Sequence, residues 1–284
     1  MLHILEHAFV HAIEDNIKIL PFLLVTYLLM EYLEHKTNNG LIQLLKRPKG
    51  GPVIGGILGI IPQCGMSAMA SNFYSGRMIT AGTVIAVFLS TSDEMLPIML
   101  SYSISVTDIV KILIFKSVIA IFVGFLVDFI IRMLKKEKKE LRIHSMCEQE
   151  HCNCEKGIVR SALHHTIHIF IFVVIITFFI NLLLEGIGED RLGGIILNNP
   201  IVGPVVASLI GLIPNCAASV VITTMYLDGL MTFGTMMAGL LSGAGVGTIV
   251  LLRVNENKKE SLGIIGILYL SGVLIGILLN LIGL

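Results

Sequence analysis

Charged residues are scarce in this chain of 284 residues. They make up 14% of the sequence, whereas soluble domains contain about 25%. Hydrophobic residues make up 55%, so the chain has too little polar surface to cover a water-soluble globule. This composition excludes a soluble protein and predicts an integral membrane protein whose first partner is the lipid bilayer.

The charge balance and the placement of cysteine exclude two further classes. The formal net charge is zero, so the composition does not predict a nucleic-acid partner. Five cysteines are present, but Cys64 and Cys216 lie in hydrophobic stretches while Cys147, Cys152 and Cys154 lie in a polar segment. This distribution is not typical of a disulfide framework.

Long apolar runs stand where the charged residues are missing. The ranges 17–33, 109–133, 167–184 and 262–284 are each long enough to cross a hydrocarbon core of about 30 Å. They are continuous, which predicts helices, since a membrane barrel would show short alternating segments. We therefore expect an all-α membrane protein.

A duplication is the most informative pattern in the sequence. Residues 51–100 recur as residues 203–252 at a constant offset of 152 and without a gap. Each copy carries an Ile-Pro-polar-Cys break within a hydrophobic segment, at 61–64 and at 213–216. Interrupted hydrophobic segments in matching positions of two halves indicate the binding site of a secondary transporter. We therefore expect a transporter and not an enzyme.

Basic residues set the orientation of the crossings. Lys135, Lys136, Lys138 and Lys139 place their loop in the cytoplasm by the positive-inside bias. The other basic segments are placed inside, and the acidic segments 101–108 and 185–200 are placed outside. In each half, two hydrophobic segments lie between a basic inside segment and an acidic outside segment. The chain must cross the membrane an odd number of times between them. One segment of each pair must turn back. The segment broken at proline is the predicted hairpin, because arms of about 11 residues span only about 16 Å.

Counting crossings in this way gives two halves of opposite orientation. Each half has three spanning helices plus one re-entrant, broken helical hairpin, so we predict an inverted repeat whose hairpin tips meet near the midplane. The predicted domains are a first repeat at 1–134, a linker at 135–157 and a second, inverted repeat at 158–284. Both termini are expected outside and the linker in the cytoplasm.

Polar residues follow the proline at each predicted tip. The proline frees a backbone carbonyl, and unwound backbone at membrane depth is stable only where protein or an aqueous cavity satisfies it. The alternative is that these residues merely kink packed helices. The symmetric arrangement places amide, thiol and hydroxyl groups around one point, so the predicted substrate-binding residues are Gln63, Cys64 and Ser67 with Asn215, Cys216 and Ser219.

The two halves differ most after the hairpins. Asp93 and Glu94 align with Gly245 and Val246 in a glycine-rich stretch. Ionisable residues inside a membrane cost at least about 2.5 kcal/mol each, which favours a function, although the acids could also lie near the outer end of their helix. Glycines opposite them would let backbone approach closely. The predicted metal ligands are Asp93, Glu94, Gln63 and Asn215.

Two lysines interrupt the apolar run 109–133. We expect Lys111 and Lys116 to extend outward along their helix, because long basic side chains reach from apolar surface towards water. Lys116 is also deep enough to pair with Asp93 or Glu94.

The linker is dense in thiol and imidazole groups. Cys147, His151, Cys152 and Cys154 could form a soft-metal site in the cytoplasm. Their spacing is not that of a zinc finger, and a disordered polar linker is the alternative.

These motifs together resemble a bacterial family of ten-helix heavy-metal exporters. The resemblance is carried by Ile-Pro-Gln-Cys-Gly-Met-Ser at 61–67, Ile-Pro-Asn-Cys-Ala-Ala-Ser at 213–219, Ser-Thr-Ser-Asp-Glu-Met-Leu-Pro at 90–97 and Cys-Glu-Gln-Glu-His-Cys-Asn-Cys at 147–154. Members are labelled as manganese transporters or as arsenic efflux proteins. The resemblance implies metal or metalloid efflux across a bacterial inner membrane.

Residue chemistry then separates the substrates. Carboxylate, amide and backbone oxygens suit manganese, whereas arsenite would use the cysteines. Positive helix N-termini at the second hairpin arms would instead favour an oxyanion, coupled to a cation at the carboxylates. A metal-sensing or channel protein is a further alternative, for which the repeat gives no support. Manganese is the leading prediction.

The predicted mechanism is alternating access, in which the hairpin-bearing bundle moves against the other helices. No phosphate-binding loop is present, so an ion gradient or the substrate's own gradient would drive transport. We expect no cofactor other than the transported ion. The sequence does not encode the oligomeric state, and a homodimer stays open.

Overall fold

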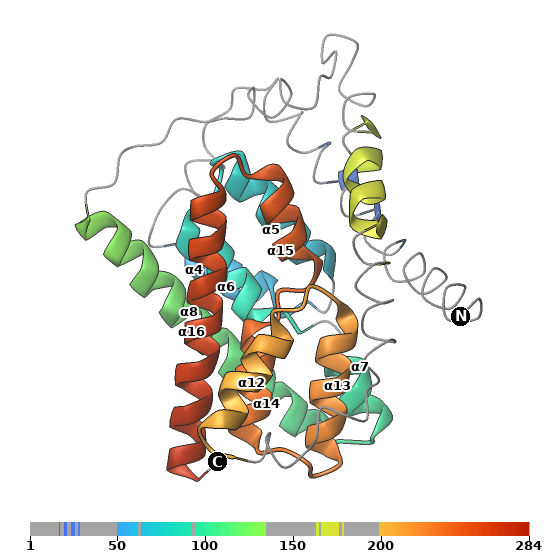
Figure 1. Cartoon of the computed structure of the whole chain (residues 1–284), viewed down its shortest axis with the longest axis vertical. Helices are drawn as coiled ribbons and strands as arrows, with labels where there is room; N and C mark the ends of the chain where they lie inside the picture. Colours follow the sequence, from blue (N-terminus) through green and yellow to red (C-terminus); the bar gives the residue numbers. More distant parts are fainter. Residues whose placement is uncertain are drawn as a thin grey trace.

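Figure 1 shows the protein as a computed structural model. The structure describes residues 50–61, 64–92, 95–134, 163–164, 166–175 and 199–283, with isolated positions between 17 and 28 and residue 178. Every regular element within these ranges is an α-helix, and they contain no strand. The predicted all-α class is confirmed for this part of the chain.

The helices of the two halves recur at the offset found in the sequence. A shift of 152 positions brings the start of each first-half helix within one residue of the start of a second-half helix. The correspondence extends to the long helices α8 and α16, beyond the segment whose sequence visibly recurs. The pairs are α4 (Gly51–Leu58) with α12 (Val202–Gly211), α5 (Cys64–Ser75) with α13 (Cys216–Leu227), α6 (Ala81–Ser90) with α14 (Phe233–Ser242), α7 (Met95–Ser101) with α15 (Val246–Val254), and α8 (Val106–Met133) with α16 (Lys258–Ile282).

Equivalent threonines begin the two central helices. Thr80 Oγ1 accepts the Thr83 N–H at 3.1 Å, and Thr232 Oγ1 accepts the Thr235 N–H at 3.2 Å. Each side chain satisfies an N–H that the first helical turn leaves without a partner. Both helices end after ten residues, and a second helix follows each of them, so α6–α7 and α14–α15 are interrupted helices.

In the part of the chain that the structure describes, four helical segments are long and apolar enough to cross a membrane. They are Ala81–Ser101, Val106–Met133, Phe233–Val254 and Lys258–Ile282. The broken segments are mostly buried inside the protein, whereas α8 and α16 leave most of their surface uncovered. By contrast, α4, α5, α12 and α13 have 8 to 12 residues. A 12-residue helix is about 18 Å long, which is too short to cross a hydrocarbon core of about 30 Å.

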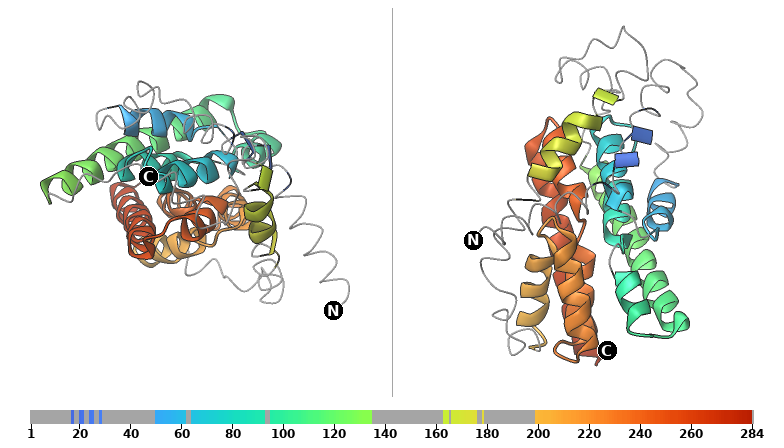
Figure 2. Two further views of the ribbon diagram at one scale, coloured as in Figure 1. Left: turned by 90° about the horizontal axis from the view of Figure 1, so that it is seen from above. Right: turned by 90° about the vertical axis from the view of Figure 1, so that its right-hand side faces the viewer.

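Each half packs its helices through glycines at equivalent positions. A Cβ atom on Gly124 of α8 would lie 2.6 Å from the Gly82 carbonyl oxygen of α6. In the second half, a Cβ atom on Gly276 of α16 would lie 2.7 Å from the Gly234 carbonyl oxygen of α14. Only glycine permits backbones to approach this closely. The groups α4–α6–α8 and α12–α14–α16 form two neighbouring layers (Figure 2).

The two layers exchange elements. Helix α5 packs on α15 of the other half, and α13 packs on α7 of the other half. Ile169 and Val173 of the helix Thr166–Ile175 join this contact through Ala68 and Ile249. Helix α16 runs along the long axis of the molecule, and helix α8 is inclined to that axis and runs in the opposite sense (Figures 1 and 2). The halves therefore interlock.

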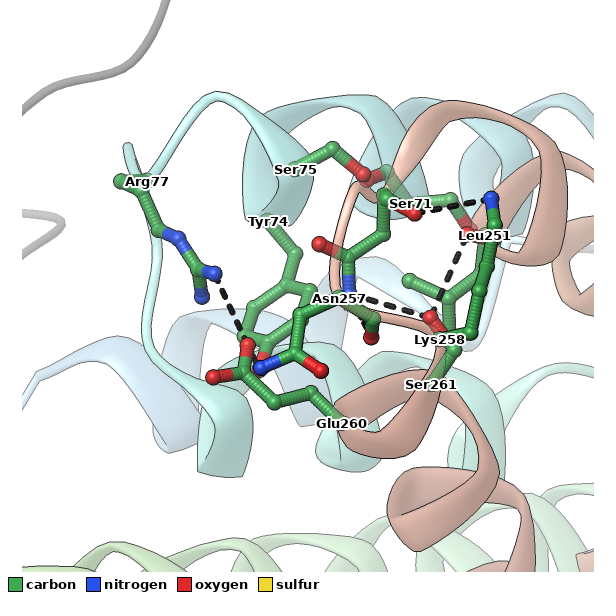
Figure 3. Close-up of polar contacts among 10 residues, drawn as sticks. Ser71, Tyr74, Ser75, Arg77, Leu251, Asn257, Lys258, Glu260 and Ser261 are labelled. Atoms are coloured by element: carbon green, nitrogen blue, oxygen red, sulfur yellow. Dashed lines mark hydrogen bonds and ion pairs between the residues drawn. The ribbon is translucent and has the colours of Figure 1, made fainter.

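Polar side chains connect the end of α5 with the start of α16 (Figure 3). Arg77 Nη2 donates to Glu260 Oε2 at 2.8 Å, and the Tyr74 hydroxyl donates to the same oxygen at 3.4 Å. Glu260 lies in the first turn of α16, where the helix dipole stabilises negative charge. Nearby, Ser71 Oγ donates to the Gly247 carbonyl at 2.7 Å, which ties α5 to α15.

Candidate functional site

A small cavity lies where the two halves meet. Its volume of about 20 Å³ is large enough for one water molecule or one dehydrated ion. Both halves contribute to its wall, and most lining residues are small or polar. They are Thr91, Ser92 and Met95 from the first half, and Gly211, Asn215, Ala218, Ser219, Gly239, Leu240, Gly243 and Gly245 from the second.

Helix α13 places an amide and a hydroxyl in this wall. Pro214 removes a backbone donor after α12, and the chain turns there, with the Asn215 N–H donating to the Ile213 carbonyl at 2.7 Å. Helix α13 begins at the next residue. Asn215 is buried, and Ser219 lies one helical turn further along the same face. The structure thus brings these two predicted residues together.

The first-half wall comes from the break between α6 and α7. Thr91 is the C-cap of α6, and its hydroxyl donates to the Val87 carbonyl at 2.7 Å. The Ser92 hydroxyl donates to the Ser90 carbonyl at 3.1 Å. Thr91 and Ser92 are both buried. The predicted ligands Asp93 and Glu94 follow Ser92 directly in the chain and lie outside the described residues.

Glycines form the opposite wall. A Cβ atom on Gly211 would lie 2.1 Å from the Gly239 carbonyl oxygen, so α12 and α14 approach through bare backbone. Gly245 has φ 51° and ψ −137°, a conformation that is essentially restricted to glycine. Backbone carbonyls are therefore close to the cavity on this side. Such a close approach of backbone is what the predicted glycine-rich stretch would allow.

Lys116 is the residue that the sequence interpretation placed wrongly. We expected its side chain to extend outward, but it is 0% exposed. Its Nζ donates to the Thr91 carbonyl at 2.5 Å and to the Leu240 carbonyl at 3.2 Å. Rotation of α8 turns this position inward. Position 116 aligns with Leu268, which is also fully buried, so both long helices turn this position inward.

Ser67 lies in a different contact from Asn215 and Ser219. It packs against Gly247 of α15, where an added Cβ atom would lie 2.7 Å from the Ser67 Cβ. Ser67 is fully buried and does not belong to the lining of the cavity. Helix α5 thus packs tightly on α15 of the other half. Helix α13 packs on α7 of the other half, and the cavity lies beside this contact.

Several predicted residues lie outside what the structure describes. These are Gln63, Asp93, Glu94, the side chains of Cys64 and Cys216, and the linker residues Cys147, His151, Cys152 and Cys154. Within the described ranges, no three His, Cys, Asp or Glu side chains cluster to hold a metal.

The surface of the described wall is more apolar than polar, and the donor atoms that its residues carry are mainly oxygens. Hydroxyl, amide and backbone carbonyl oxygens come from Thr91, Ser92, Asn215 and Ser219, and the Met95 thioether is the soft donor among the lining residues. Oxygen ligands suit hard cations such as manganese and magnesium. The ends of α6 and α14 add the partial negative charge of helix C-termini.

A comparison with known families covers nearly the whole chain. The family model described as “Putative, 10TM heavy-metal exporter” matches residues 5–190 and 170–283. These matches include every residue that lines the cavity. No curated protein and no solved structure matches the chain. The family that the motifs predicted is thereby confirmed.

Proposed function

The chain belongs to this family of heavy-metal exporters, and from that premise we propose that it is a secondary-active transporter of divalent metal cations with manganese as its main substrate. The observation that carries the proposal is the small cavity between the halves, whose lining residues offer mainly oxygens as donor atoms. Asp93 and Glu94, next to Ser92, would supply the charge that a divalent ion needs. We propose that Asp93, Glu94, Gln63 and Asn215 bind the metal.

Alternating access is the mechanism that we propose for this site. The recurring helix bounds, the opposite directions of α8 and α16, and arms too short to cross a membrane all support an inverted repeat with two re-entrant hairpins. Binding where α13 meets the break between α6 and α7 of the other half would let one small movement open the site to either face. The ion gradient or the metal's own gradient would drive this movement, and no cofactor is required.

We propose that the protein spans the bacterial inner membrane with both termini outside. The linker 135–157 would then lie in the cytoplasm, where Cys147, His151, Cys152 and Cys154 could collect soft metals before export.

Arsenite is the second candidate, and a specific position supports it. Cys216 is the first residue of α13 and follows the cavity-lining Asn215, so a thiol lies in the chain directly beside the site. A neutral thiophile would use this cysteine and Cys64. The oxyanion alternative depends on the N-terminus of α13 and is opposed by the two helix C-termini at the cavity.

Flux through reconstituted protein tests these proposals. We would measure uptake of manganese, zinc and arsenite into proteoliposomes for the wild type, Asp93→Asn and Cys64→Ser. Asp108→Asn is the matched control, because Asp108 is an exposed carboxylate at the start of α8 that pairs with Lys111. Loss of manganese flux in Asp93→Asn but not in Asp108→Asn is the expected result.

Two other outcomes would contradict the leading proposal. Arsenite flux that disappears in Cys64→Ser, with no manganese flux in any variant, makes the protein a metalloid permease. Absence of flux for all three substrates favours the oxyanion alternative, which phosphate and arsenate uptake would then test.

A further inference from the structure

Lys116 brings a positive charge to the meeting point of the two halves. Its ammonium group donates to the Thr91 carbonyl of the first half and to the Leu240 carbonyl of the second. Both residues line the cavity. The ammonium is therefore hydrogen-bonded to two residues of the wall around the place where the proposed function puts the transported cation.

Both carbonyls belong to the C-terminal ends of helices. Thr91 caps α6, and Leu240 lies in the last turn of α14. Such ends carry partial negative charge and stabilise a cation. The described sequences of helices α4, α6, α7 and α14 contain no titratable side chain, while Asp93 and Glu94 follow Thr91 within three residues of the chain and lie outside the described residues. The convergence of the two helix ends creates a place for one positive charge, which Lys116 occupies.

We propose that Lys116 is a tethered cation that takes the place of the metal in the empty transporter. This inference rests on the proposed function. Two cations at neighbouring positions in a buried site repel each other, so metal binding displaces the ammonium from the two carbonyls. When the metal leaves, the ammonium returns to them. No proton or electron is transferred in this step.

The consequence concerns the return of the empty carrier. Buried negative groups without a cation are costly, so a carrier that lacks an internal cation changes conformation only when loaded. Lys116 removes that restriction because it supplies the charge from within. Net export requires the empty carrier to return, whereas exchange of metal for metal uses the loaded carrier in both directions.

Comparing net flux with exchange in proteoliposomes of the full chain tests the inference. Lys116→Leu copies the residue at the equivalent position, Leu268. We expect it to lower net Mn²⁺ flux about tenfold or more, while exchange of labelled for unlabelled Mn²⁺ stays within about threefold of the wild type. A side chain with a merely structural role would change both modes together.

Lys116→Ala offers a second route that does not depend on leucine fitting the site. Added n-propylammonium replaces the deleted part of the side chain, and we expect it to restore net flux. Tetramethylammonium at the same concentration is the control for ionic strength, and we expect no restoration from it. Thermal unfolding in detergent establishes that each variant is folded.

The outcomes separate this inference from the proposed function. Equal loss of net flux and exchange in a folded Lys116→Leu overturns the role of Lys116, as does undiminished net flux. Wild-type protein that carries Mn²⁺ in neither mode overturns the proposed function, and the inference falls with it.

Discussion

The first and second halves of the molecule share a scaffold and differ in their charges. Gly82 and Gly234 mediate equivalent helix contacts, and Thr80 and Thr232 cap the equivalent helices α6 and α14. Lys116, by contrast, aligns with Leu268 of the second half. Duplication thus preserved the positions that hold helices together.

Among the described residues, Lys116 is an unequal position next to the cavity, through its hydrogen bonds to Thr91 and Leu240. The first half contains Lys116, Asp93 and Glu94. The aligned residues of the second half are leucine, glycine and valine, respectively. One half supplies charge, and the other supplies close-approaching backbone at Gly211 and Gly239. The comparison teaches that the symmetric residues specify the fold and that the asymmetric residues are where the chemistry should be sought.

The strongest test of the shared scaffold changes its glycines. A Cβ atom on Gly82 would lie 2.1 Å from the Gly124 carbonyl oxygen, and one on Gly234 would lie 2.3 Å from Asn280 Oδ1. We expect Gly82→Ala and Gly234→Ala each to lower the free energy of unfolding by about 2–3 kcal/mol, because the helices must separate. Reversible unfolding in mixed detergent measures this change.

The control for these variants is Gly266→Ala in α16. An added Cβ atom there meets nothing within 4 Å. We expect this variant to be as stable as the wild type or more stable by about 0.5–1 kcal/mol, since alanine favours helix over glycine. Equal destabilisation of all three variants would contradict the close-approach explanation.

A second test replaces each of two aligned polar residues, Asp128 and Asn280, with the residue of the other half. Asp128 accepts the Gly82 N–H at 2.8 Å and the Thr80 hydroxyl at 2.7 Å, while the equivalent Asn280 donates to the Pro200 carbonyl at 3.1 Å. We expect Asn280→Asp to cost about 1–3 kcal/mol of unfolding free energy, because a carboxylate would face that carbonyl.

Asp128→Asn should cost less than its reciprocal change. The amide oxygen can keep one of the two hydrogen bonds, so we expect a loss of about 1 kcal/mol. The same unfolding measurement applies. A smaller loss of unfolding free energy for Asn280→Asp than for Asp128→Asn would contradict the different polar partners of the two residues.

The helix caps offer a smaller and symmetric effect. We expect Thr80→Ala and Thr232→Ala each to cost about 1 kcal/mol of unfolding free energy, because each removes one acceptor for a first-turn N–H. Thr80→Ala should cost somewhat more, since Thr80 also donates to Asp128. Thr80→Ser and Thr232→Ser keep the acceptor and should recover most of the loss.

The smallest expected effect concerns two equivalent acids. Glu260 pairs with Arg77 across the halves at exposures of 22% and 8%, whereas Asp108 pairs with Lys111 in its own helix at 56% and 70%. We expect Glu260→Gln to lower the free energy of unfolding by less than about 1 kcal/mol. Asp108→Asn should produce no measurable change, and a larger loss there would contradict the comparison.

The sequence predicted those features that depend on local pattern. Helical class follows from continuous apolar runs, and the breaks at 59–63 and 212–215 follow from proline in each copy. The repeat at offset 152 also located Asn215 and Ser219, which lie in the cavity wall.

Features that depend on helix rotation and on partners distant in the chain could not be predicted. Whether Lys116 faces lipid or the interior is set by the rotation of α8 about its axis, and both faces of that helix are apolar in sequence. The separation of Ser67 from the cavity has a similar cause. It depends on how closely α5 packs on Gly247, which lies in the other half.

The exchange of α5 and α13 between the halves also has a consequence for biosynthesis. Helix α5 ends at residue 75, and its partner α15 begins at residue 246. At about 5–20 residues per second, the ribosome needs roughly ten seconds or more to supply that partner. During this interval the nascent first half holds polar serines of α5 without their native neighbours. Folding can therefore finish only after nearly all of the chain has been inserted, and the late step closes contacts of high sequence separation.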